Sequence, residues 1–120
     1  MKQLIIFLFL AAMLTANAQE EEAKSKLKQY YLVLLTKRAN RSQDSTSANR
    51  IQEEYLKNIG RLYEEGKIDM AGPFGDDTDW SGVFVFKVSS QEEVEKLLRT
   101  DAAISWGRLN YVIHPCWAVK

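Results

Sequence analysis

The nine residues from 66 to 74, Gly-Lys-Ile-Asp-Met-Ala-Gly-Pro-Phe, constrain the fold most because three structural signals meet there. Apolar residues recur at helical spacing before Gly66, a residue type that readily takes the left-handed conformation closing a helix. Ile68, Met70 and Gly72 then follow the two-residue period of a strand. Pro73 donates no ladder hydrogen bond, so we expect this strand to end at the Gly-Pro corner.

The first 18 residues have the layout of a secretory signal peptide. Lys2 precedes an apolar run over residues 4–14, and Ala16-Asn17-Ala18 is a small-x-small cleavage site. The run is short for a bilayer span, so the chain is expected to be exported to the periplasm or beyond, with an uncleaved membrane anchor as the alternative. Residues 19–28 are expected to be a mobile leader or a frayed helical turn, and residues 29–120 the domain.

Composition excludes several classes of function. Removal of residues 1–18, whose only charged residue is Lys2, changes the formal charge from zero to −1. This balance gives no electrostatic basis for binding nucleic acid or an anionic membrane. Cys116 is the single cysteine, which excludes an intrachain disulfide. No metal-ligand cluster and no phosphate-binding glycine loop occurs, so we expect neither a metal nor a cofactor.

The remaining patterns give alternating strands and helices. Residues 81–88 and 109–119 read as the third and fourth strands, with Pro115 at an edge or a bulge. Val94, Leu97 and Leu98 form the buried stripe of a second helix. The expected order β-α-β-β-α-β is that of an α+β, ferredoxin-like fold. The other expected elements are a strand over 30–36, a polar loop over 37–47, a helix over 48–65, a turn over 75–79, a capping box at Ser89–Glu92 or Ser90–Glu93, and a turn over 102–106.

The first helix has one apolar stripe, and Gly60 within it is expected to allow close approach to the sheet. The stripe consists of Ala48, Ile51, Tyr55, Leu56, Ile59, Leu62 and Tyr63.

The loop before this helix contains the sequon Asn40-Arg41-Ser42, which indicates either a glycosylation site or a plain solvated loop.

Three strands have large apolar residues on both faces, although helices in this fold cover only one face of the sheet. A monomer would then expose a wide apolar patch, which soluble monomers avoid. We therefore expect a symmetric homodimer formed through the helix-free face. The residues expected on that face are Val83, Val85, Ile113 and Trp117, opposite Phe84, Phe86, Val112 and Cys116.

Five segments together resemble the YCII-related (YciI-like) family over residues 30–119. The resemblance implies a dimeric α/β barrel with ferredoxin-like subunits, in agreement with the two-sided strands. The segments are the first strand, Leu62-Tyr63-Glu64-Glu65-Gly66-Lys67, Ala71-Gly72-Pro73-Phe74, the strand over 82–88, and Asp101.

The family resemblance also implies a candidate active site. Members typically have a histidine in the first helix, eleven residues before its closing glycine, and an aspartate after the second helix. Here these positions are Tyr55 and Asp101, so the pair is half present. Tyrosine, with a pKa near 10, is suited to donating a hydrogen bond or acting as an acid. His114, the only histidine, either replaces the missing one or is a satisfied strand residue; Asp101 alternatively caps the following turn.

Other residues are weaker candidates for a site. Trp80, Trp106 and Trp117 either line a ligand pocket or form part of the core. Cys116 is expected to be buried rather than reactive.

Three functions follow from these residues. The first is a binding protein for a small, partly apolar molecule that Tyr55 and Asp101 contact. The second is a proton-transfer enzyme in which Asp101 is the base and Tyr55 or His114 the acid. The third is an interaction module whose dimer surface is its function.

We predict that export removes residues 1–18, because the cleavage site is small-x-small and the apolar run is short. The intact mass of the exported protein should correspond to a chain beginning at Gln19. Recovery of the full-length chain from the membrane fraction would contradict this prediction.

Overall fold

The computed structural model describes residues 2–37 and 43–120. The chain divides into two units, residues 29–116 and a smaller unit of residues 1–28 and 117–120, and each is described by itself. The sequon at residues 40–42 lies outside the described residues. The elements are α1 (Lys2–Ser25), β1 (Leu27–Lys37), α2 (Ser45–Glu64), β2 (Ile68–Pro73), β3 (Trp80–Phe86), α3 (Gln91–Leu98), α4 (Ala102–Ser105) and β4 (Leu109–Val119).

Helix α1 has no buried residue and is long and apolar enough to cross a membrane, a property that it shares with signal sequences. The sequence predicted a mobile leader or a frayed helical turn over residues 19–28, and the structure continues the helix to Ser25. Alanine, glutamate and lysine are good helix formers, and ion pairs one turn apart support this segment. Lys24 Nζ lies 3.0 Å from Glu20 Oε1, and Lys26 Nζ lies 3.2 Å from Glu22 Oε1.

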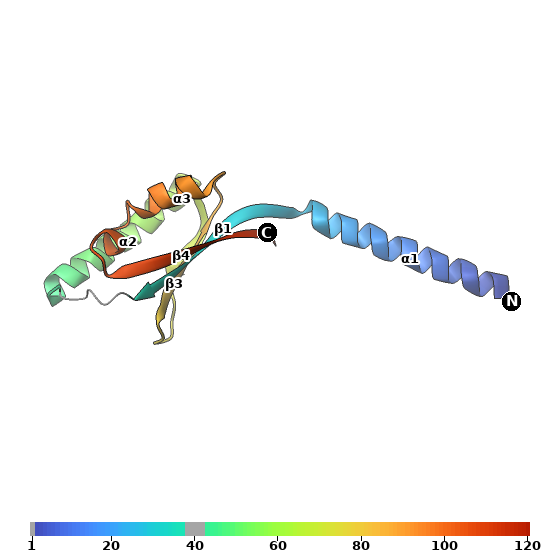
Figure 1. The fold of residues 1–120 in the computed structure, drawn as a ribbon, viewed down its shortest axis with the longest axis horizontal. Coiled ribbons are helices and arrows are strands. Elements are labelled where there is room, and N and C mark those ends of the chain that lie inside the picture. The colour runs from blue at the N-terminus through green and yellow to red at the C-terminus, as the bar shows by residue number, and fades with distance from the viewer. Residues whose placement is uncertain (1, 38–42) are drawn as a thin grey trace. The chain divides into compact units, whose positions relative to one another are not determined.

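The four strands form one sheet in the order β2-β3-β1-β4, which confirms the expected ferredoxin-like α+β fold. β3 pairs antiparallel with both β1 and β2, with Leu32 opposite Val85 in the first pair and Ala71 opposite Phe84 in the second. Figure 1 shows α2 and α3 on the same side of the strands. Strand β4 has the expected bounds, and its place at the sheet edge accommodates Pro115, which cannot donate to a ladder.

The core lies between the sheet and the helices that cover it. From the strands it takes alternate residues, among them Val33, Leu35 and Phe84, which have no exposed surface. The rings of Phe84 and Phe86 stack with centroids 5.3 Å apart. From the helices it takes Ile51 and Leu62 of α2 and Val94 and Leu98 of α3.

The other face of the sheet has apolar side chains that no helix of this unit covers. Leu32 and Leu34 of β1 and Val83 and Val85 of β3 are half-buried, while Met70 of β2 is 60% exposed. The expectation for Ile113 was wrong, because Ile113 packs against the core. Strand β4 begins with buried Leu109, and alternation from that residue turns Ile113 inward and Val112 outward.

Helix α2 begins at Ser45, three residues earlier than expected, because Asp44 caps it: the carboxylate accepts a hydrogen bond of 2.7 Å from Ser47 N. The helix ends as predicted. Gly66 has φ of 73°, and Lys67 N donates to Leu62 O at 2.9 Å, the pattern of a Schellman motif. Helix α3 follows Ser90, whose hydroxyl accepts from Glu93 N, so Ser90 is the N-cap of the second expected capping box. The Glu93 carboxylate pairs with Lys67 Nζ at 3.1 Å.

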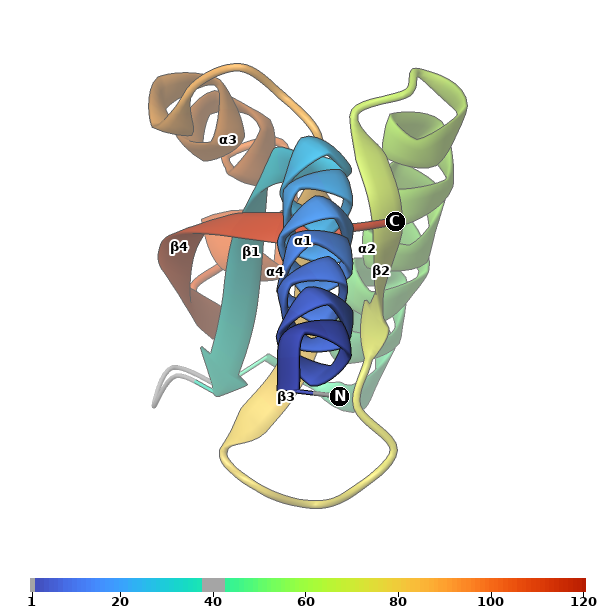
Figure 2. The ribbon, with the colours of Figure 1, turned by 90° about the vertical axis from the view of Figure 1, so that its right-hand side faces the viewer.

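The buried stripe of α2 differs in part from the expected one. Leu56 and Tyr63 are exposed, and Asn58 is buried instead. Gly60 has no atom within 4 Å of an added Cβ, so it makes no close approach to the sheet. The close backbone approach occurs at Gly82 in the β2–β3 hairpin, where a Cβ would lie 2.6 Å from Gly72 O. Figure 2 shows the loop of this hairpin reaching beyond the strands.

Alanine at the two glycines should have opposite effects on the free energy of unfolding. Gly60→Ala should stabilise the protein by about 1 kcal/mol, the difference in helix propensity at an uncrowded position. Gly82→Ala should destabilise it by about 1–3 kcal/mol, because backbone must shift to admit the methyl group. Urea unfolding of both variants measures this difference, and equal effects would contradict the hairpin geometry.

Candidate functional site

Helices α2 and α4 pack together and bring three polar side chains into the interior. Tyr55 and Asn58 lie one turn apart on α2 and are 3% and 9% exposed. Asp101 is the N-cap of α4 and has no exposed surface. A buried carboxylate beside a buried phenol and amide is uncommon in a small core, and this cluster is the candidate site.

The two carboxylate oxygens of Asp101 differ in their hydrogen bonding. Its Oδ1 atom accepts hydrogen bonds from Ala103 N at 2.9 Å and Ile104 N at 3.2 Å, so Asp101 caps α4 as the sequence allowed. Its buried Oδ2 atom has no hydrogen-bond partner among the described residues. Burial raises the pKa of this carboxyl above its ordinary value, against the smaller lowering effect of the two backbone amides.

Asn58 presents its amide nitrogen to the interior. Its Oδ1 accepts from Arg61 Nη2 at 2.7 Å, and because a guanidinium only donates, this bond fixes which way the amide faces. The buried Nδ2 atom has no partner within the described chain. Asn58 lies near enough to Asp101 to lower the pKa of the Asp101 carboxyl. The Asn58 Nδ2 and Asp101 Oδ2 atoms nevertheless do not meet hydrogen-bond geometry. The sequence interpretation missed Asn58, whose only signal was its position three residues after Tyr55.

Tyr55 packs its ring edge-on against Phe84, with centroids 6.2 Å apart. Burial, and secondarily the charge of Asp101, raises the pKa of its phenol above the ordinary value. The two side chains are therefore neighbours, but no hydrogen bond joins them. From the sequence we also expected the Tyr55 hydroxyl to hydrogen-bond to the Asp101 carboxylate if the two shared a pocket. That expectation was wrong, since Asp101 Oδ1 accepts from the amides of α4 and Oδ2 has no partner among the described residues.

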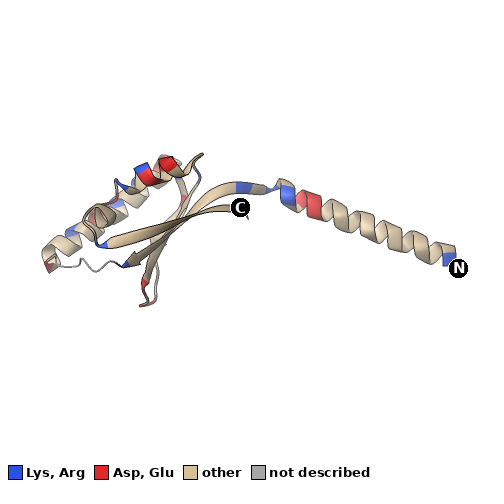
Figure 3. Cartoon of the chain, viewed as in Figure 1, with Lys and Arg blue, Asp and Glu red and all other residues tan. Residues whose placement is uncertain are grey.

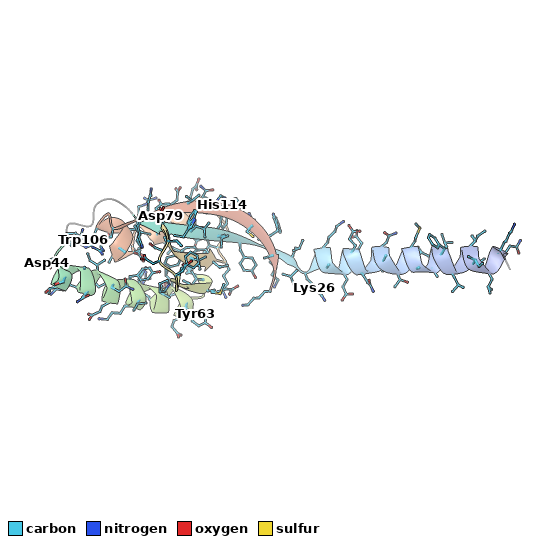
Figure 4. The ribbon with its side chains drawn as sticks, turned by 90° about the horizontal axis from the view of Figure 1, so that it is seen from below. Lys26, Asp44, Tyr63, Asp79, Trp106 and His114 are labelled. Atoms are coloured by element: carbon cyan, nitrogen blue, oxygen red, sulfur yellow. The ribbon has the colours of Figure 1, made fainter. Side chains whose placement is uncertain are left out.

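His114 does not belong to this cluster. It is exposed on β4, and Figure 4 shows it on the side of the strands away from α2. The strand period places it on the face opposite Ile113, which packs against the core. Within one chain His114 therefore cannot act as the acid that partners Asp101.

Two of the three tryptophans line separate hollows. Trp106 lines a groove of about 320 Å³ beside α2, whereas Trp80 lines a separate hollow of about 380 Å³ with Leu34 and Phe74. Trp117 belongs to the smaller unit and is exposed. Of the two alternatives for the tryptophans, a place in the core is wrong because all three are exposed, whereas Trp80 and Trp106 each line a hollow. The groove beside α2 is lined by Gln43, Ser47, Arg50, Ile51, Glu54 and Trp106.

The groove adjoins the polar cluster through the same two elements. Ile51 lies one turn before Tyr55 on α2, and Trp106 ends the short helix that Asp101 begins. Cys116 is half-buried, less than expected. No group of three or more histidine, cysteine, aspartate or glutamate residues in the described ranges could hold a metal ion.

The fold and the site define a ferredoxin-like α+β protein with a buried carboxylate, phenol and amide beside a groove. No family model and no curated protein matches the chain, so its place in the YCII-related family stays a prediction. Among solved structures it is similar to 5-chloro-2-hydroxyhydroquinone dehydrochlorinase (TftG) from Burkholderia phenoliruptrix AC1100, in complex with 2,5-dihydroxybenzoquinone. The identity is 20% over 71% of this chain and 90% of that chain, with a TM-score of 0.49, a likeness that carries nothing about activity.

Replacing Asp101 by Asn should change how stability depends on pH. A carboxyl whose pKa is raised by folding binds its proton more tightly in the native state, so its contribution to stability is lost as pH rises from about 3.8 through the raised value. Asp101→Asn retains a capping oxygen without this titration. The variant should gain stability relative to the wild type over that window, by at most about 1.4 kcal/mol per pH unit.

Urea titrations at a series of pH values measure the difference between the two proteins. A difference that is constant with pH, or that falls as pH rises, would contradict the raised pKa of Asp101.

Proposed function

We propose that this chain is an exported protein of the YCII-related type that binds a small, partly apolar molecule between α2 and α4. The observation that carries the proposal is the pair of buried, unpaired atoms, Asp101 Oδ2 and Asn58 Nδ2, beside Tyr55. Each such atom costs about 1–3 kcal/mol, a cost that a purely structural core avoids. A ligand that enters from the adjoining groove would satisfy them once local movement admits its polar end.

Proton transfer is the second candidate, favoured by the raised pKa of Asp101, since perturbed carboxyls gather at active sites. The weak point of a proton-transfer mechanism is the acid that would act together with Asp101. His114 lies on the other face of the sheet, and the raised pKa of Tyr55 makes this phenol hold its proton more firmly. A phenol that stays protonated is suited to donating a hydrogen bond to a ligand. The geometry therefore supports ligand binding better than it supports catalysis.

The proposal is tested by what co-purifies with the protein. Wild-type protein, expressed with its own N-terminal segment, is isolated without denaturation, and the extracted small molecules are identified by mass spectrometry. Asp101→Asn should lose the bound molecule, and the control Lys57→Gln, an exposed change on the same helix, should retain it. Equal retention by both variants, or no bound molecule in the wild type, would refute the proposal.

The same proposal includes a homodimer that covers the helix-free face of the sheet. Strands β3 and β4 contain no lysine, arginine, aspartate or glutamate, and Figure 3 shows the charges gathered largely on the helices. A face with two strands free of charge, which exposes Met70 and Val112 beside half-buried Leu32 and Val85, is of the kind that interfaces cover. A second copy presents the same face and is the simplest partner.

Replacing Val85 by Lys should yield monomer or aggregate, because burying a valine is worth about 1.5–3 kcal/mol and a buried ammonium costs more. Leu56→Lys places the same charge on the exposed side of α2 and should remain dimeric. Sedimentation at micromolar concentration distinguishes these states, and a monomeric wild type would refute the interface.

A further inference from the structure

We infer that the groove between α2 and α4 binds a molecule with a planar apolar body and a single carboxylate, which Arg50 anchors. This inference rests on the proposed binding function and names the chemistry of its ligand. The groove volume of about 320 Å³ lies at the lower end of small-molecule sites, enough for one aromatic ring with a short substituent.

One wall of the groove is held in place by hydrogen bonds. Gln43 Nε2 donates to Trp106 O at 3.2 Å, and Arg108 Nη1 donates to Gln43 Oε1 at 2.9 Å. These two bonds join the segment before α2 to the end of α4, so this wall of the groove is held in place before a ligand arrives. Preorganisation of this kind lowers the entropic cost of binding.

Among the described residues that line the groove, Arg50 is the cation. Glu54 lies one turn further along α2, at a spacing that often gives an ion pair, but among the described residues no carboxylate lies within 4 Å of Arg50. The other cation nearby, Arg108, already donates to Gln43. The helix N-terminus is also occupied, since the Asp44 carboxylate accepts from Ser47 N. A ligand carboxylate in the groove would therefore pair with the Arg50 guanidinium, whose parallel N–H groups can donate two hydrogen bonds to the two carboxylate oxygens.

Glu54 limits the charge of the ligand. The described lining has one positive and one negative side chain, so it favours a monoanion that pairs with Arg50, and a second carboxylate would be repelled by Glu54. The apolar body of the ligand has two contacts suited to a planar ring. Trp106 is 60% exposed beside the groove, and Ile51 forms its inner wall. Exposed tryptophan faces stack well on planar molecules.

The test uses benzoate as the probe, benzamide as its neutral equivalent, and phthalate as the dianion. Each is titrated into the full mature protein, and binding is followed by NMR at the backbone amides of residues 47–54 and the Trp106 indole. Benzoate should bind about tenfold more tightly than benzamide or phthalate. Arg50→Gln should remove that preference, and Lys57→Gln, which makes the same charge change outside the groove, should leave it intact.

Equal affinity for benzoate and benzamide, no shift at the groove amides, or an unchanged preference in Arg50→Gln would overturn the inference. A neutral molecule found co-purifying with the protein, and lost in Asp101→Asn, would also overturn it while leaving the proposed binding function standing.

Discussion

The antiparallel pairing of β1 with β3 is the constraint on which the rest of the structure depends. Opposed residues share a face, so one register sends Phe84 and Val33 into the core and leaves Val85 and Leu32 on the helix-free side. A slip by one residue would exchange the two faces. The covered face supports the helices that hold the polar cluster, and the uncovered face supplies the proposed interface.

The polar cluster exists because α4 needs a cap in a buried position. A four-residue helix has few hydrogen bonds of its own, and the Asp101 carboxylate satisfies two of its free amides. This cap places an ionisable carboxyl where the core excludes water, so burial raises the pKa of Asp101, and its second oxygen has no partner among the described residues. Structure and candidate function thus depend on the same side chain.

The groove beside α2 is open to solvent, whereas the polar cluster of Tyr55, Asn58 and Asp101 is buried. The groove combines Arg50 and Glu54 with the faces of Trp106 and Ile51, and is braced by Gln43. A molecule bridging the two would place its apolar body and its carboxylate in the groove, and a second, uncharged polar group toward Tyr55. The raised pKa of Tyr55 keeps that hydroxyl a donor throughout the physiological range.

The sequence by itself determined the order of elements, because periodicity, Gly66, Pro73 and the Ser90 cap are local signals that act within a few residues. It could not place Asn58 or Ile113, since whether a residue at a helix or strand position is buried depends on which face its neighbours cover. Only the tertiary structure decided that Asp101 bonds α4 rather than Tyr55 and that His114 lies on the opposite face of the sheet. Those outcomes depend on contacts between segments distant in sequence, where geometry to within an ångström decides whether a hydrogen bond forms.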